Sequence, residues 1–348
     1  MKGERGDELS KDTLIIDGDA LVYSSGFVGE RRELKAVHKQ TGDEFTFKGR
    51  TEMYGKKRSK DGGWLAEINK TKGTPWTVDD FDLYDIQIPA PVEFSLQATK
   101  SLILKATELT GIKERRLFVG KGESQRVEQS TLIKYKSGRE GLLRPIHKDA
   151  IVEYMVKYHN AEVVEGVEVD DRVTMLAWED PHNVIYGIDK DYLGTNSRVF
   201  NPNTPEKGIQ DCRCWGDLWV EEIISKTTGK KRYKVKGYGR KWFLHQWCYG
   251  DDSDSYRSNC ASELEWGEMA SYNVLKDAKN NREGLEAIVS AYKTLYPTPR
   301  EVVGWRGDNI LCDWKYVSSE IFQMAHMLRT PEDDSSAEKV LSRYGLWE

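Results

Sequence analysis

The amino-acid sequence predicts an α/β fold with a parallel central sheet and helices on both faces. Short apolar segments with the composition of buried strands begin at Thr13, Leu117, Glu162 and Asn183. Between them lie longer segments in which apolar residues recur with the spacing of a helix. Strands that alternate with helices imply parallel pairing, because each crossover helix returns the chain to the same end of the sheet.

The predicted elements follow one another without an internal repeat. Strands are expected at residues 13–16, 117–119, 162–164 and 183–188, and helices at 91–111, 146–158 and 170–178. After residue 191, strands are expected at 197–200, 218–224 and 232–236, and helices at 241–248, 269–276, 284–295 and 321–328. Residues 30–90 are rich in glycine turn signals between short β-like segments, and are predicted to be β-hairpins inserted into the domain.

The composition favours a protein of the cytoplasm that does not enter a membrane. The chain has 348 residues, of which 31% are charged, and no apolar run approaches the roughly 18 residues that span a bilayer. Its first residues are polar, unlike a signal peptide. The 5 cysteines show no zinc-site spacing, so they are expected to be reduced thiols.

Two basic segments stand out against a formal net charge of −5. Residues 112–148 contain 10 Lys or Arg and 4 Glu, and residues 226–241 contain 8 basic residues and no acidic one. Separate basic stripes in an acidic protein suit a polyanionic substrate that is processed at a metal site. A solvated basic hairpin is the alternative for the second stripe.

Acidic residues gather at the ends of the predicted elements. They are Asp17, Asp19, Glu168, Asp170, Asp171, Asp189, Asp191, Asp251 and Asp254. The carboxyl ends of parallel strands meet at one edge of the sheet, so these side chains are expected to converge there. Convergent carboxylates repel one another unless a hard divalent cation compensates them. The number matches the needs of a two-metal phosphoryl-transfer site. Helix capping by Asp170 or Asp171 and a turn at Asp189 are the alternative explanations.

Five motifs in this order resemble the flap endonuclease and 5′-3′ exonuclease family, most closely its bacteriophage branch and the nuclease domain of bacterial DNA polymerase I. The motifs are Ile16-Asp17-Gly18-Asp19, Tyr135-Lys136-x-x-Arg139, Glu168-x-Asp170-Asp171, Asp189-Lys190-Asp191 and Gly250-Asp251-x-x-Asp254. The resemblance spans roughly residues 13–295. It implies a PIN-like 5′-nuclease fold.

The resemblance also implies a metal-dependent nuclease that hydrolyses phosphodiester bonds in DNA with free 5′ ends, flaps or junctions. The nine acidic residues would bind Mg²⁺ or Mn²⁺, in two sites. Lys136 and Arg139 would act on the scissile phosphate, and Tyr135 would stack on a base. The other expected nucleic-acid contacts are Lys121, Arg126, Arg144, Lys230, Lys231 and Arg232. Replication proteins would be further partners, and the chain would be a viral protein acting in the cytoplasm of a bacterial host cell.

The domain organisation follows from the same resemblance. Residues 1–242 would form the nuclease core, with the β-rich insertion at about 30–90 and an arch or clamp at about 120–146. Residues 243–300 would be a helix-loop-helix element that binds duplex DNA, and residues 301–348 a tail packed on the core.

The chain departs from the family pattern in four ways. Glu123 is the nearest acidic residue where the family has an Asp after the second strand, Ser255 replaces a common Asn, and only Trp266-Gly267 remains of a Gly-x-Gly hairpin. The insertion and the net acidity are the fourth departure. These differences concern the choice of substrate more than the chemistry.

Two other classes of function are compatible with part of the pattern. In a haloacid-dehalogenase-like phosphatase, Asp17 would be the nucleophile, but the other acidic groups and the basic loop would be unexplained. A non-catalytic nucleic-acid-binding replication protein would explain the missing Asp and the altered hairpin. It would not explain why so many carboxylates that repel one another are kept.

Overall fold

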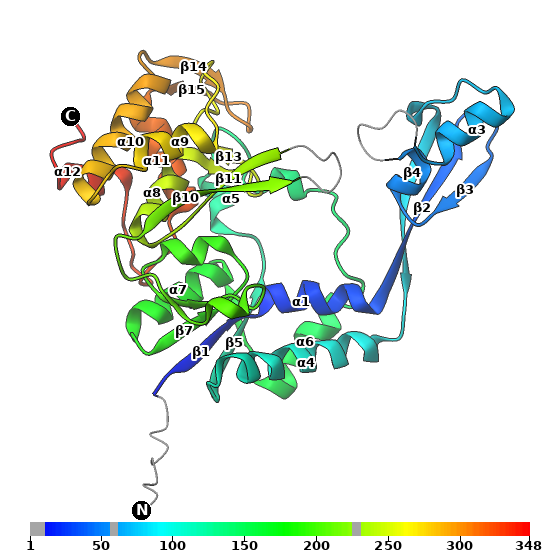
Figure 1. Ribbon diagram of the computed structural model, residues 1–348, viewed down its shortest axis with the longest axis horizontal. Coiled ribbons are helices and arrows are strands. Elements are labelled where there is room, and N and C mark those ends of the chain that lie inside the picture. The colour runs from blue at the N-terminus through cyan, green and yellow to red at the C-terminus, as the bar shows by residue number, and fades with distance from the viewer. Residues whose placement is uncertain (1–10, 56–61, 225–230) are drawn as a thin grey trace, which may run out of the picture.

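The structure, a computed structural model, describes residues 11–55, 62–224 and 231–348. Its centre is a six-stranded sheet in the order β6-β5-β1-β7-β8-β9 (Figure 1). The strands are β1 (Thr13–Asp17), β5 (Glu114–Lys121), β6 (Glu162–Glu165), β7 (Asn183–Tyr186), β8 (Arg198–Phe200) and β9 (Gln210–Asp211). Neighbours pair in parallel, except that β9 is antiparallel to β8. The predicted α/β class is confirmed, but the sheet is mixed at its β9 edge and not purely parallel.

Helices cover both faces of this sheet. They are α1 (Gly18–Gly26), α4 (Val92–Thr110) and α6 (Lys148–His159) on one face and α7 (Val169–Glu179) on the other. The buried residues of β1 alternate accordingly, because successive side chains of a strand point to opposite faces. Leu14 and Ile16 pack in the core of the first face and Ile15 in the core of the second. Each is fully buried, which stabilises the fold by about 1.5–3 kcal/mol per side chain.

Helix α1, which was not predicted, begins directly after β1. Its N-terminus is capped by Asp17, whose Oδ1 accepts the backbone N–H of Asp19 at 3.0 Å. Position 18 requires glycine, because a Cβ there would lie 2.4 Å from the carbonyl oxygen of Phe118. The strand-to-helix turn therefore holds Asp17 and Asp19 at the carboxyl edge of the sheet.

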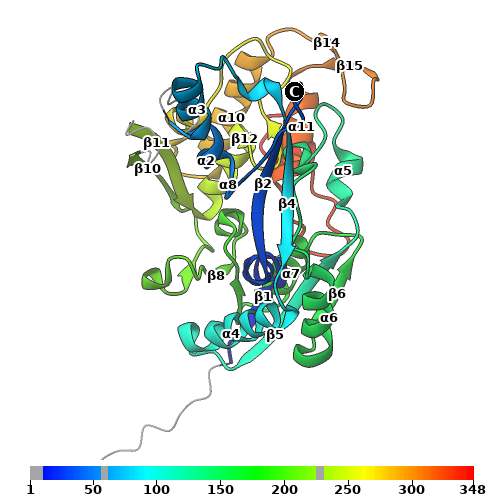
Figure 2. The ribbon, with the colours of Figure 1, turned by 90° about the vertical axis from the view of Figure 1, so that its right-hand side faces the viewer.

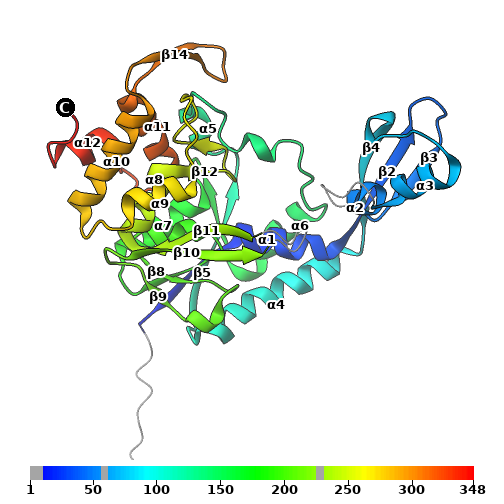
Figure 3. The ribbon, with the colours of Figure 1, turned by 45° about the horizontal axis from the view of Figure 1, so that its top comes forward.

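The predicted insertion is an arm that projects away from the body (Figures 1 and 3). It contains β2 (Glu30–His38), β3 (Glu44–Phe47), β4 (Phe81–Pro89), α2 (Arg50–Tyr54) and α3 (Trp64–Lys72). Figure 2 shows the long strands β2 and β4 side by side, and they pair from Glu30 with Pro89 to His38 with Phe81. The prediction of β-hairpins is confirmed for the three strands, whereas the two helices were not predicted. The head of the arm has an aromatic core of its own.

The base of the arm is bonded to the chain that precedes α6. Arg32 donates to the carbonyl oxygen of Leu143 at 2.9 Å, and Gln87 donates to that of Arg144 at 2.7 Å. The Glu30 carboxylate accepts the N–H of Ile146 at 2.9 Å. The insertion and the predicted arch segment are therefore anchored to each other.

The C-terminal part shares one core. Its elements are β10 (Asp217–Ile224), β11 (Lys231–Tyr238), α8 (Gly239–Tyr249), β12 (Gly250–Asp251), β13 (Tyr256–Arg257), α9 (Glu268–Leu275), α10 (Asn281–Leu295), β14 (Arg300–Val303), β15 (Asn309–Cys312), α11 (Trp314–Ala325) and α12 (Ala337–Ser342). Side chains from β10 through α12 pack in this core. The predicted boundary at residue 242 lies inside α8, and the one at 300 lies at the start of β14, so neither separates independent units.

The strand predicted at residues 197–200 is confirmed as β8, which pairs with β7 and continues the central sheet. Within the three described stretches, no helix is long and apolar enough to cross a membrane.

Candidate active site

A cavity of about 500 Å³ opens at the carboxyl ends of β1, β5 and β7. Its lining contains charged residues of both signs. The acidic residues are Asp17, Asp19, Glu123, Glu168, Asp170, Asp189 and Asp254. The basic residues are Lys121, Lys136, Arg139, Arg144 and Lys148. Six of the nine predicted metal ligands are thus brought to one cavity, as the strand-end argument predicts.

Asp17 and Asp19 stand on the floor of the cavity. Asp17 is 6% exposed, and its Oδ2 accepts the hydroxyl of Tyr192 at 3.1 Å. Burial, together with the neighbouring charge of Asp19, raises the pKa of Asp17 to about 7. Asp19 accepts the backbone N–H of Gly120 at 2.9 Å, and burial raises its pKa also. The negatively charged form of both carboxylates is therefore disfavoured in the folded protein, and a bound cation would stabilise it.

Helix α7 supplies Glu168 and Asp170 at its N-terminus. Burial and the charges of Asp17, Glu168 and Asp189 raise the pKa of Asp170 well above its ordinary value. Glu168 behaves in the opposite way. Burial alone would raise its pKa, but the charges of Arg126 and Lys136 outweigh burial and lower it. Asp170 is therefore the uncompensated carboxylate of this pair.

The remaining acidic residues lie behind the cavity. Asp251 is 4% exposed and pairs with Lys190. Asp191 accepts a hydrogen bond from Gln246, and burial and the charge of Asp189 raise its pKa well above the ordinary value. Neither Asp191 nor Asp251 lines the cavity itself.

The electrostatic couplings connect these residues into two overlapping groups. Asp17 and Asp170 are each influenced by the charge of Asp189. Asp191 is influenced by Asp189 as well, and also by Asp251 and Asp254. The two groups therefore meet at Asp189, which lies three residues after the end of β7 and caps the following 3₁₀ helix.

The chemistry of the donor set fits Mg²⁺ or Mn²⁺, which prefer carboxylate oxygens and retain water ligands. The described residues contain no group of three or more His, Cys, Asp or Glu side chains arranged to hold a metal ion. The carboxylates instead use nearby cations, as Glu168 does with Lys136 and Asp254 with Arg139. Binding of a metal through Glu168 or Asp254 would therefore require these ion pairs to break. Asp17 and Asp170 form no ion pair among the described residues, so no cation would have to leave them.

A segment between α5 (Gln125–Gln129) and α6 crosses the cavity and carries Lys136 and Arg139. It is largely irregular, with one 3₁₀ turn at Ser137–Arg139. Its position is fixed by the loop after β12: the N–H of Lys136 donates to the carbonyl oxygen of Asp254 at 2.8 Å, and that of Gly138 to Ser255 Oγ at 3.0 Å. The backbone of Lys136 has a φ of 58°, in the left-handed region that few non-glycine residues adopt.

The Lys136 ammonium remains charged in this environment. Burial would lower its pKa, but the charges of Glu168, Asp254 and Asp170 raise it. Arg139 is half exposed and donates to Ser253 and Asp254. Both side chains are thus held at the cavity with their positive charge facing carboxylates.

Two predicted nucleic-acid contacts are wrong. Tyr135 is 4% exposed, and its hydroxyl oxygen lies 3.2 Å from a Glu168 oxygen and 3.1 Å from an Asp254 oxygen, which share its one proton, so no base can stack on it. Arg126 is 3% exposed and lies in the interior. In a sequence, a basic residue of a buried ion pair looks the same as one on a nucleic-acid-binding surface.

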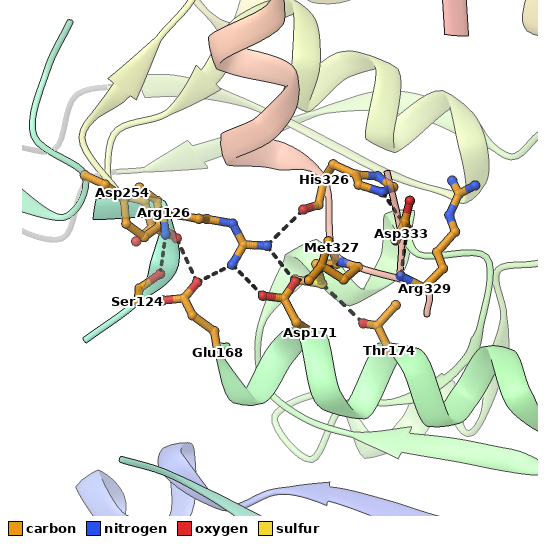
Figure 4. A network of polar contacts seen from close by, with 12 residues as sticks. Ser124, Arg126, Glu168, Asp171, Thr174, Asp254, His326, Met327, Arg329 and Asp333 are labelled. Carbon is orange, nitrogen blue, oxygen red and sulfur yellow. Dashed lines mark hydrogen bonds and ion pairs between the residues drawn. The ribbon is translucent and has the colours of Figure 1, made fainter. Parts of the chain in front are cut away.

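The prediction that Asp171 is a metal ligand is also wrong, because Arg126 occupies it. Arg126 donates to both oxygens of Asp171, at 2.7 and 3.0 Å, and to the carbonyl oxygen of His326 at 2.9 Å (Figure 4). The N–H of Leu328 donates to the same carboxylate at 2.9 Å. Asp171 is fully buried and joins α7 to α5 and to the chain after α11.

The other predicted basic contacts lie on the surface. Lys121 and Arg144 are exposed at the cavity, where Lys121 pairs with Glu165 at 2.9 Å. Lys231 and Arg232 are exposed on β11, away from the cavity lining. Lys230 and Lys226 lie outside the described residues.

The cavity lining also includes a cation and two aromatic residues that were not predicted as site residues. Lys148 lies at the start of α6, and its charge lowers the pKa of Asp19, against the effect of burial. Tyr23 and Phe27 are 39% and 44% exposed at the cavity. Asp19 and Tyr23 lie on one side of α1, and Phe27, the residue that ends the helix, continues the same four-residue spacing. That spacing could have revealed both aromatic residues if α1 had been predicted.

No protein-family model matches the chain, and a search of curated proteins finds no match.

Proposed function

We propose that this chain is a metal-dependent 5′ nuclease of the flap endonuclease and 5′-3′ exonuclease type, with a PIN-like core. Its substrate would be DNA that carries a free 5′ end, a flap or a junction. The observation that supports the proposal best is the cavity at the carboxyl edge of the sheet, where uncompensated buried carboxylates face a basic segment.

The acidic part of the cavity would hold Mg²⁺ or Mn²⁺. Asp17, Asp19, Asp170 and Asp189 are the proposed cavity ligands, with Glu168 and Asp254 available once their cations move away. Asp191 and Asp251 would orient these ligands from behind. If two divalent ions were held there, they would supply activation of a water molecule and stabilisation of the charge on the leaving oxygen in phosphodiester hydrolysis.

The basic part of the cavity would bind the phosphate of the scissile bond. Lys136 is charged, partly exposed and held in place through its backbone, so its ammonium can move from Glu168 to a phosphate oxygen without a change of the fold. Arg139 can donate hydrogen bonds to two oxygens of one phosphate, because its guanidinium presents a fork of donors. Lys121, Arg144 and Lys148 would extend the positive surface along the bound DNA strand.

Exposed aromatic rings would bind the bases next to that phosphate. Tyr23 and Phe27 pack edge to face with ring centroids 6.1 Å apart, and both remain exposed at the cavity. A base that stacks on such a ring gains about 1–3 kcal/mol without regard to its identity. These residues take the role that the sequence suggested for Tyr135.

A labelled 5′-flap duplex tests the proposal. Purified protein with Mg²⁺ or Mn²⁺ should cleave it, and Asp170→Asn and Asp189→Asn should each lower the rate by at least about 100-fold, since even outer-shell changes cost 10–100-fold. Asp308→Asn, at an exposed position between β14 and β15, is the matched control and should keep the rate. Equal rates in all four proteins would refute the assignment of the site.

Lys136→Ala separates chemistry from binding. It should lower kcat more than it weakens binding of the flap, because the ammonium acts on charge that develops at the phosphate. Lys134→Ala, two residues away and paired with Glu140, is the control that should change neither. A loss confined to binding would assign Lys136 to the grip on DNA.

The two alternative functions predict different results with the same proteins. In the phosphatase hypothesis, Asp17 would attack phosphorus, yet both of its oxygens accept hydrogen bonds, from Asp19 N–H and from Tyr192. Hydrolysis of a small phosphomonoester that disappears in Asp17→Asn would support it. The non-catalytic hypothesis is favoured by the lack of a preformed metal-ligand group in the described residues. Binding of flapped DNA without any cleavage would establish it.

A further inference from the structure

A second cavity, of about 610 Å³, lies at the other end of α7. Its walls come from Trp178 at the end of α7, the start of α8, the connection between α9 and α10, and the chain that follows α11. It shares no lining residue with the first cavity. Asp170 and Trp178 are separated by eight residues of α7, about 12 Å along the helix axis.

This cavity is strongly basic. Its lining contains Arg240, Lys279, Arg329, Lys339 and Arg343, against a single carboxylate, that of Asp334. Asp334 pairs with Lys339. The other four cations form no ion pair with any carboxylate in the part of the chain that the structure describes, although the charge of Asp333 acts on Arg329 without a direct contact.

Arg240 and Arg329 are positioned by contacts that do not neutralise them. Arg240 Nε donates to Asn281 Oδ1 at 3.0 Å, and its guanidinium lies 4.6 Å from the centre of the Phe243 ring. The guanidinium of Arg329 lies 4.5 Å from the centre of the Trp178 ring. Burial and the charge of Arg329 lower the pKa of Arg240 to about 10. The two guanidinium groups therefore repel each other in a partly buried place.

The charge of Asp333 offsets this repulsion only in part, because it raises the pKa of Arg329 while burial and Arg343 still keep that pKa below its ordinary value. The Oδ2 of Asp333 is bonded to His326 Nε2 at 3.0 Å and accepts the backbone N–H of Arg329 at 2.9 Å. Buried charges are normally paired, so a cavity that holds several unpaired guanidinium groups is suited to an anion from solution.

We propose that this second cavity binds a phosphate-bearing small molecule of the size of a nucleoside monophosphate, with Arg240, Arg329 and Arg343 on the phosphate. Guanidinium groups match phosphate geometry through paired donors. The volume lies in the ordinary range of small-molecule sites, about 300–1,000 Å³. Trp178, Trp215 and Tyr344 provide apolar surface for the rest of the molecule. The proposal does not depend on nuclease activity.

Calorimetric titration with deoxyadenosine monophosphate tests it, in buffer that contains EDTA so that no metal takes part. Binding is expected, inorganic phosphate should compete, and deoxyadenosine should bind at least about 100-fold more weakly, since charge-assisted hydrogen bonds to the phosphate are lost. No heat with either the nucleotide or inorganic phosphate at millimolar concentration would overturn the proposal. Equal affinity for the nucleotide and deoxyadenosine would overturn it too.

Variants locate the binding. Arg240→Gln and Arg329→Gln should each weaken nucleotide binding at least about tenfold, the effect of one lost charge-assisted contact. Arg343→Gln, at an exposed position, gives the same test where a change at Arg240 disturbs folding. Lys136→Ala in the first cavity and Arg116→Gln, which removes a surface ion pair with Glu162, should leave the affinity unchanged. A loss of binding in Lys136→Ala, or full affinity in all three arginine variants, would refute the site.

Discussion

Replacing Asp17 by Asn should stabilise the metal-free protein, by an amount that grows as the pH rises from about 4 and is complete above about 7. The pKa of Asp17 rises from 3.8 to about 7 on folding, through burial and the charge of Asp19. Between these two values the folded state binds more protons than the unfolded state, so stability falls as the pH rises from about 4 to 7. A shift of about 3 pKa units corresponds to about 4 kcal/mol at pH 8.

Asparagine resembles the protonated acid and avoids this cost. Its amide oxygen can still accept the hydrogen bond from the N–H of Asp19. It cannot also accept the one from the Tyr192 hydroxyl, and the loss of that hydrogen bond lowers the stability by about 1 kcal/mol. The net gain expected for Asp17→Asn at pH 8 is therefore about 3 kcal/mol at most, with no gain at pH 4, where wild-type Asp17 is protonated as well.

Urea unfolding in EDTA at both pH values measures this difference directly. Asp308→Asn makes the same chemical change at an exposed position and should alter the free energy of unfolding by less than about 0.5 kcal/mol at either pH. Adding Mg²⁺ at pH 8 should stabilise the wild type more than Asp17→Asn, since only the native carboxylate binds the ion fully. A variant that is less stable than the wild type at pH 8 in EDTA would refute the repulsion argument.

Three further substitutions probe the support of the site. Arg126→Met should cost about 3–5 kcal/mol in urea unfolding, because it leaves the buried Asp171 without a cation; Arg126→Met combined with Asp171→Leu should recover much of the loss. Gly120→Ala should slow cleavage more than it lowers stability, since the added Cβ would lie 2.9 Å from Asp19 Oδ2 and displace that carboxylate. Burial lowers the pKa of His245 to about 3, so the folded state resists a proton that the unfolded state accepts below about pH 6.5. Stability should therefore fall from pH 6.5 toward 3, by at most about 1.4 kcal/mol per pH unit, and His245→Gln should reduce that slope. An unchanged slope would place the acid sensitivity elsewhere.

The position of the carboxylates could be predicted from the sequence because it follows from topology. Asp17 is the last residue of β1 and Asp189 follows the end of β7 by three residues, and parallel strands deliver such residues to one edge. Periodicity also located α4, α9 and α10 to within a few residues. What these cases share is that neighbouring residues alone carry the information.

The errors arose where a distant partner decides the role of a side chain. Asp170 and Asp171 are adjacent in the sequence but about 100° apart around α7, and only the packed structure shows which one faces the cavity. The sequence places Arg126 in a basic segment that resembles a surface. In the structure it is buried by contacts with Asp171 and with His326, which is 200 residues away in the chain. Tyr135 is likewise buried, and its hydroxyl contacts the carboxylates of Glu168 and Asp254, which are distant in the sequence.

The ion pairs of the metal-free site indicate how the two halves of the proposed chemistry depend on each other. Lys136 pairs with Glu168, Arg139 with Asp254 and Lys190 with Asp251. A divalent cation competes with Lys136 and Arg139 for their carboxylates, and a phosphate competes with the same carboxylates for the two side chains. Each ligand thus releases the groups that the other one needs, and by linkage each must increase the affinity for the other to the same degree. The ion pairs partly neutralise these carboxylates in the structure. In the proposed function, metal and phosphate together would replace the pairs of Lys136 and Arg139 more completely than either ligand would alone.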